Sequence, residues 1–178
     1  MNLFNQTFTL GQIADATGIP VQTIKTWVHK KLILSLPTGG EGPGVKRQYS
    51  FFGAMEIAIA GALLGAGVRD NDVAFNAATS FSHTGDGPLP STPARIPGCP
   101  YGEGLTFIAV GNGKYTEICY RPGKDQLVNV QHDLGGAEVM ILVEITPIFK
   151  RVVAGLGYDP VEAMQMARSD IERMAKEA

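Results

Sequence analysis

Apolar residues recur at helical spacing in two short neighbouring segments near the start of the chain. Residues three and four apart lie above one another on a helix, so each segment has one apolar face. On the first segment this face holds Leu10, Ile13 and Ala14, and on the second it holds Ile24, Trp27 and Val28. Gly18 stands between them, and glycine readily adopts the left-handed conformation that ends a helix and turns the chain. The pattern predicts a helical hairpin over residues 10–31.

The spacing within this hairpin is typical of DNA-binding helix-turn-helix units. Ala14 is followed by Gly18 four residues later, by a branched apolar residue at 24 and by a bulky one at 27. The other face of the second helix is polar and basic, and holds Gln22, Thr23, Lys25, Thr26, His29 and Lys30. The alternative interpretation is a helical hairpin packed in an ordinary core.

A β-hairpin is predicted after the second helix. Residues 32–36 and 45–49 can form extended strands around residues 37–44, whose glycines and prolines cannot sustain a helix. Lys46 and Arg47 would lie on its exposed edge, where cations can meet phosphates. The run GGEGPGVK also suggests a phosphate-binding loop, but it lacks the Gly-Lys-Ser/Thr ending and no helix start follows. The wing interpretation is therefore favoured.

Two further helices are expected next. Ser50 can cap a nearly uncharged apolar helix over residues 51–67, and such a helix is usually buried on several sides. Asp70 or Asn71 can cap a shorter helix that runs to about Ser80.

The first 80 residues contain three sequence motifs in a characteristic order: IADATGIPVQTIKTWVHKKLI, KRQYS and LLGAGV. This order resembles the winged-helix DNA-binding domain of MerR-type regulators and the related excisionase-like domains. The resemblance covers about residues 8–80. It implies that the second helix enters the major groove and that the wing holds the DNA backbone. The positions it assigns to DNA contact are Gln22, Thr23 and Lys25 on the helix and the basic pair Lys46–Arg47 on the wing. The remaining candidate DNA contacts are Thr26, His29, Lys30 and Tyr49.

The chain also departs from that family. The family commonly has Arg at the positions of Gln22 and Lys25, Tyr at Thr26 and Gly at Lys31. MerR-type regulators usually continue into a long dimerising helix, which is not expected after residue 80 here. The affinity and the sequence preference are therefore expected to differ from those of the family.

Charge is distributed unevenly along the 178 residues. The formal net charge is −2, but residues 1–52 hold five Lys and Arg against two Asp and Glu, while residues 53–178 hold ten against fifteen. A basic first part on an acidic body would direct DNA to one face. The +3 of the first part is modest for a DNA-binding protein.

Composition divides the chain into three parts, residues 1–81, 82–104 and 105–178. Residues 82–104 hold five prolines and five glycines, which is typical of a semi-rigid linker. Alternating apolar residues and three turns then predict a four-stranded antiparallel meander, with strands at 105–110, 115–120, 126–132 and 138–145. Two helices complete the last part, one from Pro147 to about Gly155 and one from Pro160 to about Lys176. The predicted class is α+β.

The last predicted helix has an apolar stripe that holds Val161, Met164, Ala167, Ile171 and Met174. This stripe can pack on its own sheet or on a second subunit. We favour a homodimer, and the last part could also sense a small-molecule or protein effector.

The sequence contains no recognisable catalytic or metal-binding motif. Cys99, Cys119 and the three histidines lack metal-ligand spacing, and no nucleophile motif occurs. Alternating carboxylates are expected on the solvated face of the sheet, at Glu117, Glu138 and Glu144. Four aromatic residues could line a pocket, although cross-strand packing explains them better: Tyr101, Phe107, Tyr115 and Tyr120. No enzyme activity, cofactor or metal is expected.

The chain lacks a long apolar run, a basic-then-apolar start and a cysteine framework, so a reduced cytoplasmic location without a membrane partner is expected. The sequence thus predicts a sequence-specific double-stranded DNA-binding transcriptional regulator that acts as a homodimer. Two alternatives remain open: an architectural or packaging DNA binder, such as an excisionase or a phage terminase small subunit, and a protein-interaction module that does not bind DNA.

Overall fold

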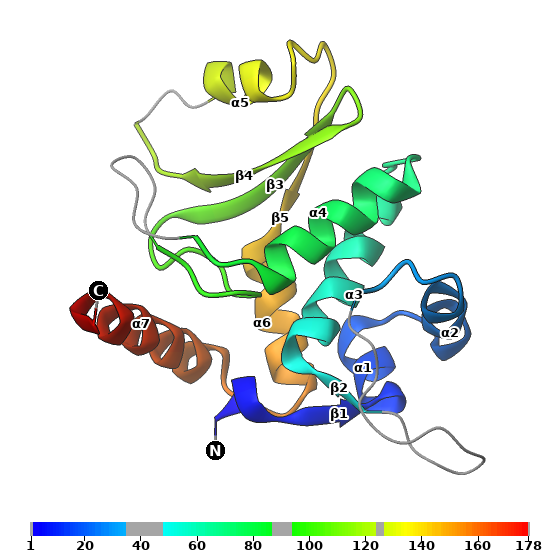
Figure 1. Cartoon of the computed structure of the whole chain (residues 1–178), viewed down its shortest axis with the longest axis vertical. Helices are drawn as coiled ribbons and strands as arrows, with labels where there is room; N and C mark the ends of the chain where they lie inside the picture. The colour runs from blue at the N-terminus through cyan, green and yellow to red at the C-terminus, as the bar shows by residue number, and fades with distance from the viewer. Residues whose placement is uncertain (1, 35–47, 87–93, 124–126, 178) are drawn as a thin grey trace.

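The computed structural model describes residues 2–34, 48–86, 94–123 and 127–177, with no side-chain description for 127–128 and 174–177. In these residues the chain is a mixed α+β protein with two small antiparallel sheets, as the sequence predicts for its class. Figure 1 shows a three-stranded sheet above a group of helices, and the two-stranded sheet below them.

The predicted helical hairpin is present as two helices, α1 (Leu10–Thr17) and α2 (Val21–His29). Thr9 caps α1 through a reciprocal pair of hydrogen bonds with Gln12, which satisfies free N–H groups of the first turn. Gly18 ends α1 with φ at +74°, the left-handed conformation expected there.

The strand that follows residue 47 has a different partner from the expected one. β2 (Gln48–Ser50) pairs antiparallel with β1 (Thr7–Thr9) before the first helix. Residues 32–34, the described part of the expected first wing strand, form no strand. The rest of the predicted wing, including Lys46 and Arg47, lies outside the described residues.

The two central helices follow their predicted caps. Ser50 caps α3 (Phe51–Gly65) by accepting a hydrogen bond from Gly53 N, and Asp70 caps α4 (Asn71–His83) in the same way. α3 is buried along most of its length, as its uncharged sequence predicts, and it packs closely against α4.

The larger sheet has three strands in the order β4-β3-β5, namely β3 (Leu105–Gly111), β4 (Lys114–Tyr120) and β5 (Ile141–Glu144). The β3–β4 turn is confirmed, since Asn112 and Gly113 have φ values of +50° and +68°.

The expected strand over residues 126–132 is wrong, because α5 (Leu127–Asp133) occupies this segment. Val130 and Leu134 lie one helical turn apart and are both buried against Ala109 and Ile118 of the sheet. Over seven residues, apolar alternation and helical spacing are hard to distinguish, so tertiary packing decides.

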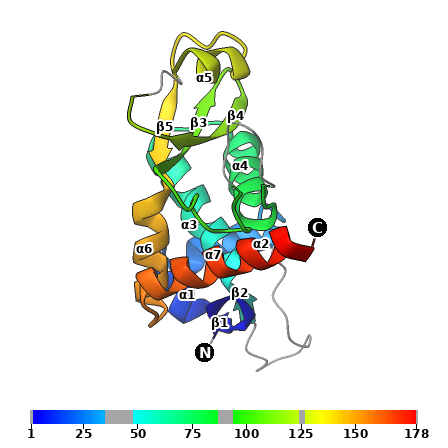
Figure 2. The same ribbon diagram turned by 90° about the vertical axis from the view of Figure 1, so that its left-hand side faces the viewer.

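Helices cover both faces of this sheet. Figures 1 and 2 show α5 on one face and α3 and α4 beyond the other. α6 (Ile145–Gly155) follows β5 directly and contacts α1, α3 and β3. A Cβ at Gly155 would lie 2.6 Å from Cα of Ala16, so the backbones of α6 and α1 cross in direct contact. One hydrophobic core therefore joins the predicted first and last parts.

The described residues of the predicted linker are packed rather than extended. Arg95, Cys99 and Tyr101 are buried, and Asp86 and Arg95 form an antiparallel backbone bridge. Gly98 N also donates a hydrogen bond to Phe81 O at the end of α4. This segment is therefore attached to the helices, whereas its composition predicted a spacer. Prolines and glycines here shape a tight packed loop.

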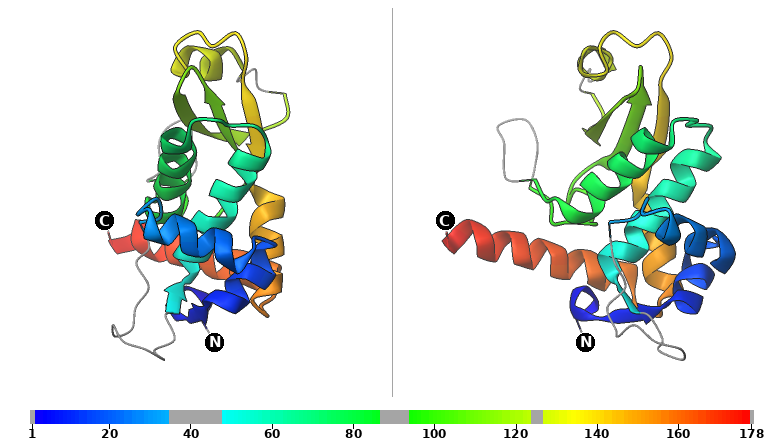
Figure 3. Two further views of the ribbon diagram at one scale, coloured as in Figure 1. Left: turned by 90° about the vertical axis from the view of Figure 1, so that its right-hand side faces the viewer. Right: turned by 45° about the vertical axis from the view of Figure 1, so that its right-hand side comes forward.

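The chain begins with a short 3-10 helix, η1 (Leu3–Asn5), and ends with α7 (Pro160–Glu177). Asp159 caps α7 by accepting hydrogen bonds from Val161 N and Glu162 N, as its sequence predicts. Figure 3 shows α7 projecting from the body of the molecule, on the side away from α2.

Candidate nucleic-acid interface

The outer face of α2 presents polar and basic side chains to solvent. The sequence assigns six residues to this face. Thr23 is half-buried, and the other five are exposed: Gln22, Lys25, Thr26, His29 and Lys30. The hydroxyl of Thr26 donates to Gln22 O at 2.9 Å, so it is used within the helix. No acidic residue lies on α2.

The inner face of α2 holds the helix firmly against the body. Ile24 is fully buried, and the Trp27 and Phe75 rings meet edge to face with centroids 5.2 Å apart. A Cβ at Gly61 of α3 would approach Ile19 Cδ1 to 2.4 Å, so the turn between α1 and α2 rests directly on α3. The polar face of α2 is thus fixed in orientation by α3 and α4.

α2 ends in a Schellman arrangement. Lys31 N donates to Val28 O and Leu32 N donates to Trp27 O, at 3.1 and 3.0 Å. This places Lys31 at φ +56°, a conformation that costs a side-chain-bearing residue roughly 1–2 kcal/mol. A glycine at this position, as the family resemblance implies, would avoid that strain.

Beyond this turn, a buried carboxylate anchors the chain. Glu56 on α3 is fully buried and accepts hydrogen bonds from Leu34 N at 2.7 Å and Thr79 Oγ1 at 2.8 Å. His83 Nε2 lies 2.9 Å from its other oxygen. Sequence reasoning missed this group, although one acidic residue in an otherwise uncharged apolar helix is the signal that reveals it.

The expected wing residues are only partly described. Tyr49 is 2% exposed on β2, so its side chain belongs to the core and is not presented to solvent as the predicted DNA contact requires. It lies opposite Phe8 of β1, which is also buried. Lys46 and Arg47 fall outside the described residues.

A second buried charge cluster lies at the junction of α4 and the larger sheet. Arg95 is 3% exposed, and its Nε lies 2.9 Å from Glu117 Oε2 and 3.1 Å from Asp86 Oδ2. Arg95 Nη2 also contacts Glu117, and Nη1 donates to Phe81 O at 3.0 Å. The expectation that Glu117 faces solvent is therefore wrong, because its side chain is turned toward Arg95.

The remaining ionisable groups around Arg95 are held in their neutral forms. Burial, reinforced by the hydrogen bond from Tyr101 to Asp86, raises the pKa of Tyr101 well above its ordinary value. Burial likewise raises the pKa of Cys99 far above that of a free thiol, so a thiolate nucleophile is not available there. The polar groups of this cluster hydrogen-bond to one another, so we assign the cluster a structural role.

The four aromatic residues considered for a pocket do not converge. Phe107 and Tyr120 lie on one face of the sheet with ring centroids 6.3 Å apart, while Tyr115 lies on the opposite face and Tyr101 in the Arg95 cluster. A groove of about 170 Å³ lies instead between η1 and α7, beside Leu3, Tyr158 and Met166. Across the described residues, no group of three or more His, Cys, Asp or Glu side chains is placed to hold a metal ion.

Compared with known proteins, the chain matches no family model and has no significant match among curated sequences. Within the described part of the chain, none of the helices has the length and apolar character needed to cross a membrane.

Proposed function

We propose that this chain is a sequence-specific double-stranded DNA-binding transcriptional regulator with a MerR-like winged helix-turn-helix head, and that it acts as a homodimer. The observation that carries the proposal is the acid-free, exposed face of α2, which is held rigidly by its buried face. An α-helix fits the major groove, where side chains at its outer face can reach base edges.

The side chains of this face suit two kinds of DNA contact, to base edges and to phosphates. Gln22 and Lys25, in the first half of α2, have the donors that read base edges, while Lys30 and Lys31 at its end suit phosphates. Over residues 10–31 the only acidic residue is Asp15, against three lysines. This local excess of positive charge supports DNA binding better than the net charge of the whole chain does.

A homodimer would raise the effective concentration of each head for its half-site. Two copies related by a two-fold axis read half-sites about one helical turn apart, roughly 34 Å. A single head of this size makes few phosphate contacts, so linking two heads compensates for their modest individual affinity.

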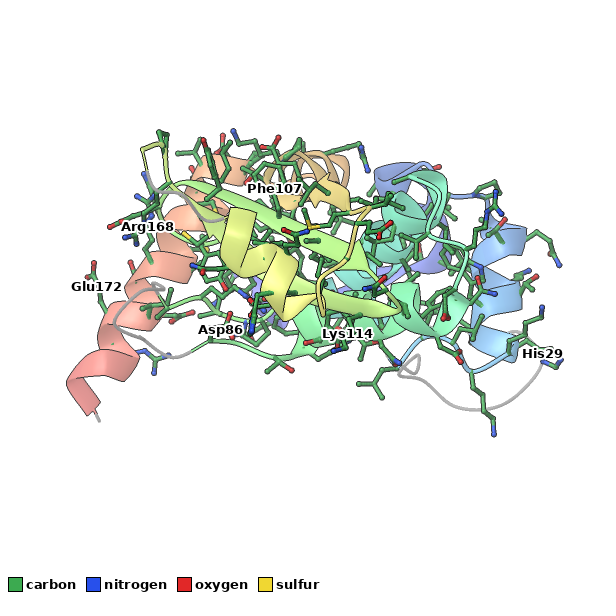
Figure 4. All side chains as sticks on the ribbon, turned by 90° about the horizontal axis from the view of Figure 1, so that it is seen from above. His29, Asp86, Phe107, Lys114, Arg168 and Glu172 are labelled. Carbon is green, nitrogen blue, oxygen red and sulfur yellow. The ribbon has the colours of Figure 1, made fainter. Side chains whose placement is uncertain are left out.

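The test starts from a random-sequence duplex library, because selection supplies the preferred site. On the selected duplex, Lys25→Ala is expected to reduce discrimination against mutated sites by ~1–3 kcal/mol, since the ammonium group would contact a base edge. Lys114→Ala is the matched control, because Figure 4 shows Lys114 far from the α2 residue His29. Gel shifts over a salt series measure both.

The outcomes are distinct. Equal losses for Lys25→Ala on all duplexes would assign Lys25 to a phosphate. Selection that enriches no sequence, with no salt-dependent binding of random duplex, would reject DNA binding. Strong bending of the selected duplex in the absence of any effect on a promoter would favour the architectural role over the regulatory one.

A further inference from the structure

The two edges of the larger sheet are protected to different degrees. β4 carries Lys114 at its exposed start and the inward-turned charge of Glu117, and α4 and α5 both contact it. Charged residues and covering helices are the usual means by which proteins protect a sheet edge. β5 carries one charge, Glu144 at its last position. The preceding residues 140–143 read Met-Ile-Leu-Val, and among the described residues β5 pairs only with β3.

Two exposed apolar side chains lie at the β5 edge, and two more lie elsewhere on the sheet. Leu142 is 46% exposed on β5, and Val139 is 77% exposed just before it. Of the seven large apolar side chains that are exposed in the described residues, four lie on the sheet or on the approach to β5: Leu105, Tyr120, Val139 and Leu142.

These side chains share one face of the sheet. The register places Leu142 opposite Ala109 and Tyr120 opposite Leu105, on the face that also holds Phe107. Figure 4 looks onto this face, with α5 lying across the sheet and Phe107 beside it. Helix α5 buries Ala109 and Ile118, which leaves Leu105, Tyr120 and Leu142 accessible on a face that also holds Lys114, Thr116 and Glu144.

The outer backbone of β5 specifies the kind of partner that fits it. An edge strand offers a row of N–H and C=O groups, and another extended strand is the element that pairs with such a row. The partner strand must also place apolar side chains beside Leu142.

A second copy of β5 meets both conditions. In an antiparallel pair centred on Leu142, the two Leu142 side chains face each other and Glu144 faces Met140 of the other copy, so no like charges meet. Such a contact is isologous, because one two-fold axis satisfies the exposed edge of both copies at once. We infer that β5 pairs with β5 of a second copy and extends the sheet from three strands to six.

This inference deepens the proposed homodimer and rests on it, and it differs from the dimer predicted through the last helix. The apolar stripe of α7 is partly used within its own chain, since Ala167 is buried in the common core and Met164 packs against it. Among the described side chains of α7, Val161 is the large apolar one that is exposed, at 64%. It therefore provides a matched control for Leu142.

The experiment is analytical ultracentrifugation of the full chain over a range of concentrations. The unaltered chain is expected to dimerise, Leu142→Lys to weaken dimerisation at least tenfold, and Val161→Lys to leave it unchanged. Both side chains are exposed, so both variants are expected to keep the circular dichroism of the unaltered chain. Hydrogen exchange should show amides of residues 141–144 becoming protected as the dimer forms.

Two results would overturn the inference: a chain that is monomeric at all concentrations, or a dimer that Val161→Lys disrupts while Leu142→Lys does not. A monomer that still binds its selected duplex would reject the β5 interface and leave DNA binding in place. A dimer sensitive to Leu142→Lys that binds no DNA would reject the proposed function and keep the interface.

Discussion

Two buried ionisable side chains, Glu56 and Arg95, hold this molecule together in different ways. Glu56 is a single carboxylate that receives neutral donors, namely the backbone of Leu34 and the hydroxyl of Thr79, together with His83. Arg95 is a cation placed between two carboxylates, with a backbone carbonyl as a further acceptor. Both are almost inaccessible to water.

The difference lies in what each charge connects. Glu56 ties the chain that leaves α2 to α3 and α4, so it acts within the helical part that presents α2. Arg95 joins the end of α4, the loop at residues 94–101 and strand β4, so it fastens the sheet to the helices. Breaking a buried ion pair leaves an uncompensated charge and costs about 3–5 kcal/mol, which is more than the roughly 1–3 kcal/mol lost when a buried hydrogen-bonding group loses a partner.

The largest effect is expected for Arg95→Met. Methionine keeps much of the buried volume but leaves Glu117 without its cation, so the free energy of unfolding should fall by about 3 kcal/mol. Urea denaturation measures this change. Arg151→Met, at an exposed position on α6, is the control and should change stability by less than about 0.5 kcal/mol. Equal small losses for the two variants would show that Arg95 does not hold the sheet in place.

A smaller effect is expected for Glu56→Gln. The amide keeps one acceptor oxygen but replaces the other with an NH2 group that would face donors, so the free energy of unfolding should fall by about 1–2 kcal/mol. The exposed Glu138→Gln is the control. Amide exchange measured by NMR should accelerate at Leu34 more than at β3 residues. Uniform acceleration across the molecule would contradict a local anchoring role for Glu56.

The smallest effect concerns pH and Glu117. Burial raises the pKa of the Glu117 carboxyl above its ordinary value, although Arg95 opposes this. The folded state therefore holds this proton more tightly than the unfolded state, and the associated stability is present below pH 4.5 and lost as the pH rises through the folded-state pKa. Relative to Glu117→Gln, the unaltered chain should lose stability as the pH rises above 4.5. Urea midpoints at several pH values measure this, and a relative gain with rising pH would mean that Arg95 outweighs burial.

The helical part could be predicted from sequence because its signals are local. Thr9, Gly18, Ser50 and Asp70 each begin or end a helix through contacts within a few residues. The face of α2 follows from the same short-range pattern. The left-handed conformation of Lys31 is not predicted by the local sequence, because glycine is the residue that usually adopts it.

The sheet part was predicted less well because its structure depends on distant partners. Segment 127–133 is helical since Val130 and Leu134 meet Ala109 and Ile118, which no seven-residue window contains. Arg95 was assigned to a spacer, and its burial depends on Asp86 and on Glu117, which lies 22 residues away. Glu56 likewise has partners 22 and 23 residues away, at Leu34 and Thr79.

The direct contact between Gly155 and Ala16 has a consequence for the order in which the chain is made. The ribosome makes α1 long before α6. The surface of α1 around Ala16 therefore lacks its packing partner until the last quarter of the polypeptide has been made. Contacts so far apart in sequence form slowly, because a long loop must close first. Until α6 is made, α1 would therefore lack one of the helices it packs against, while the α3 and α4 contacts that orient α2 could already form.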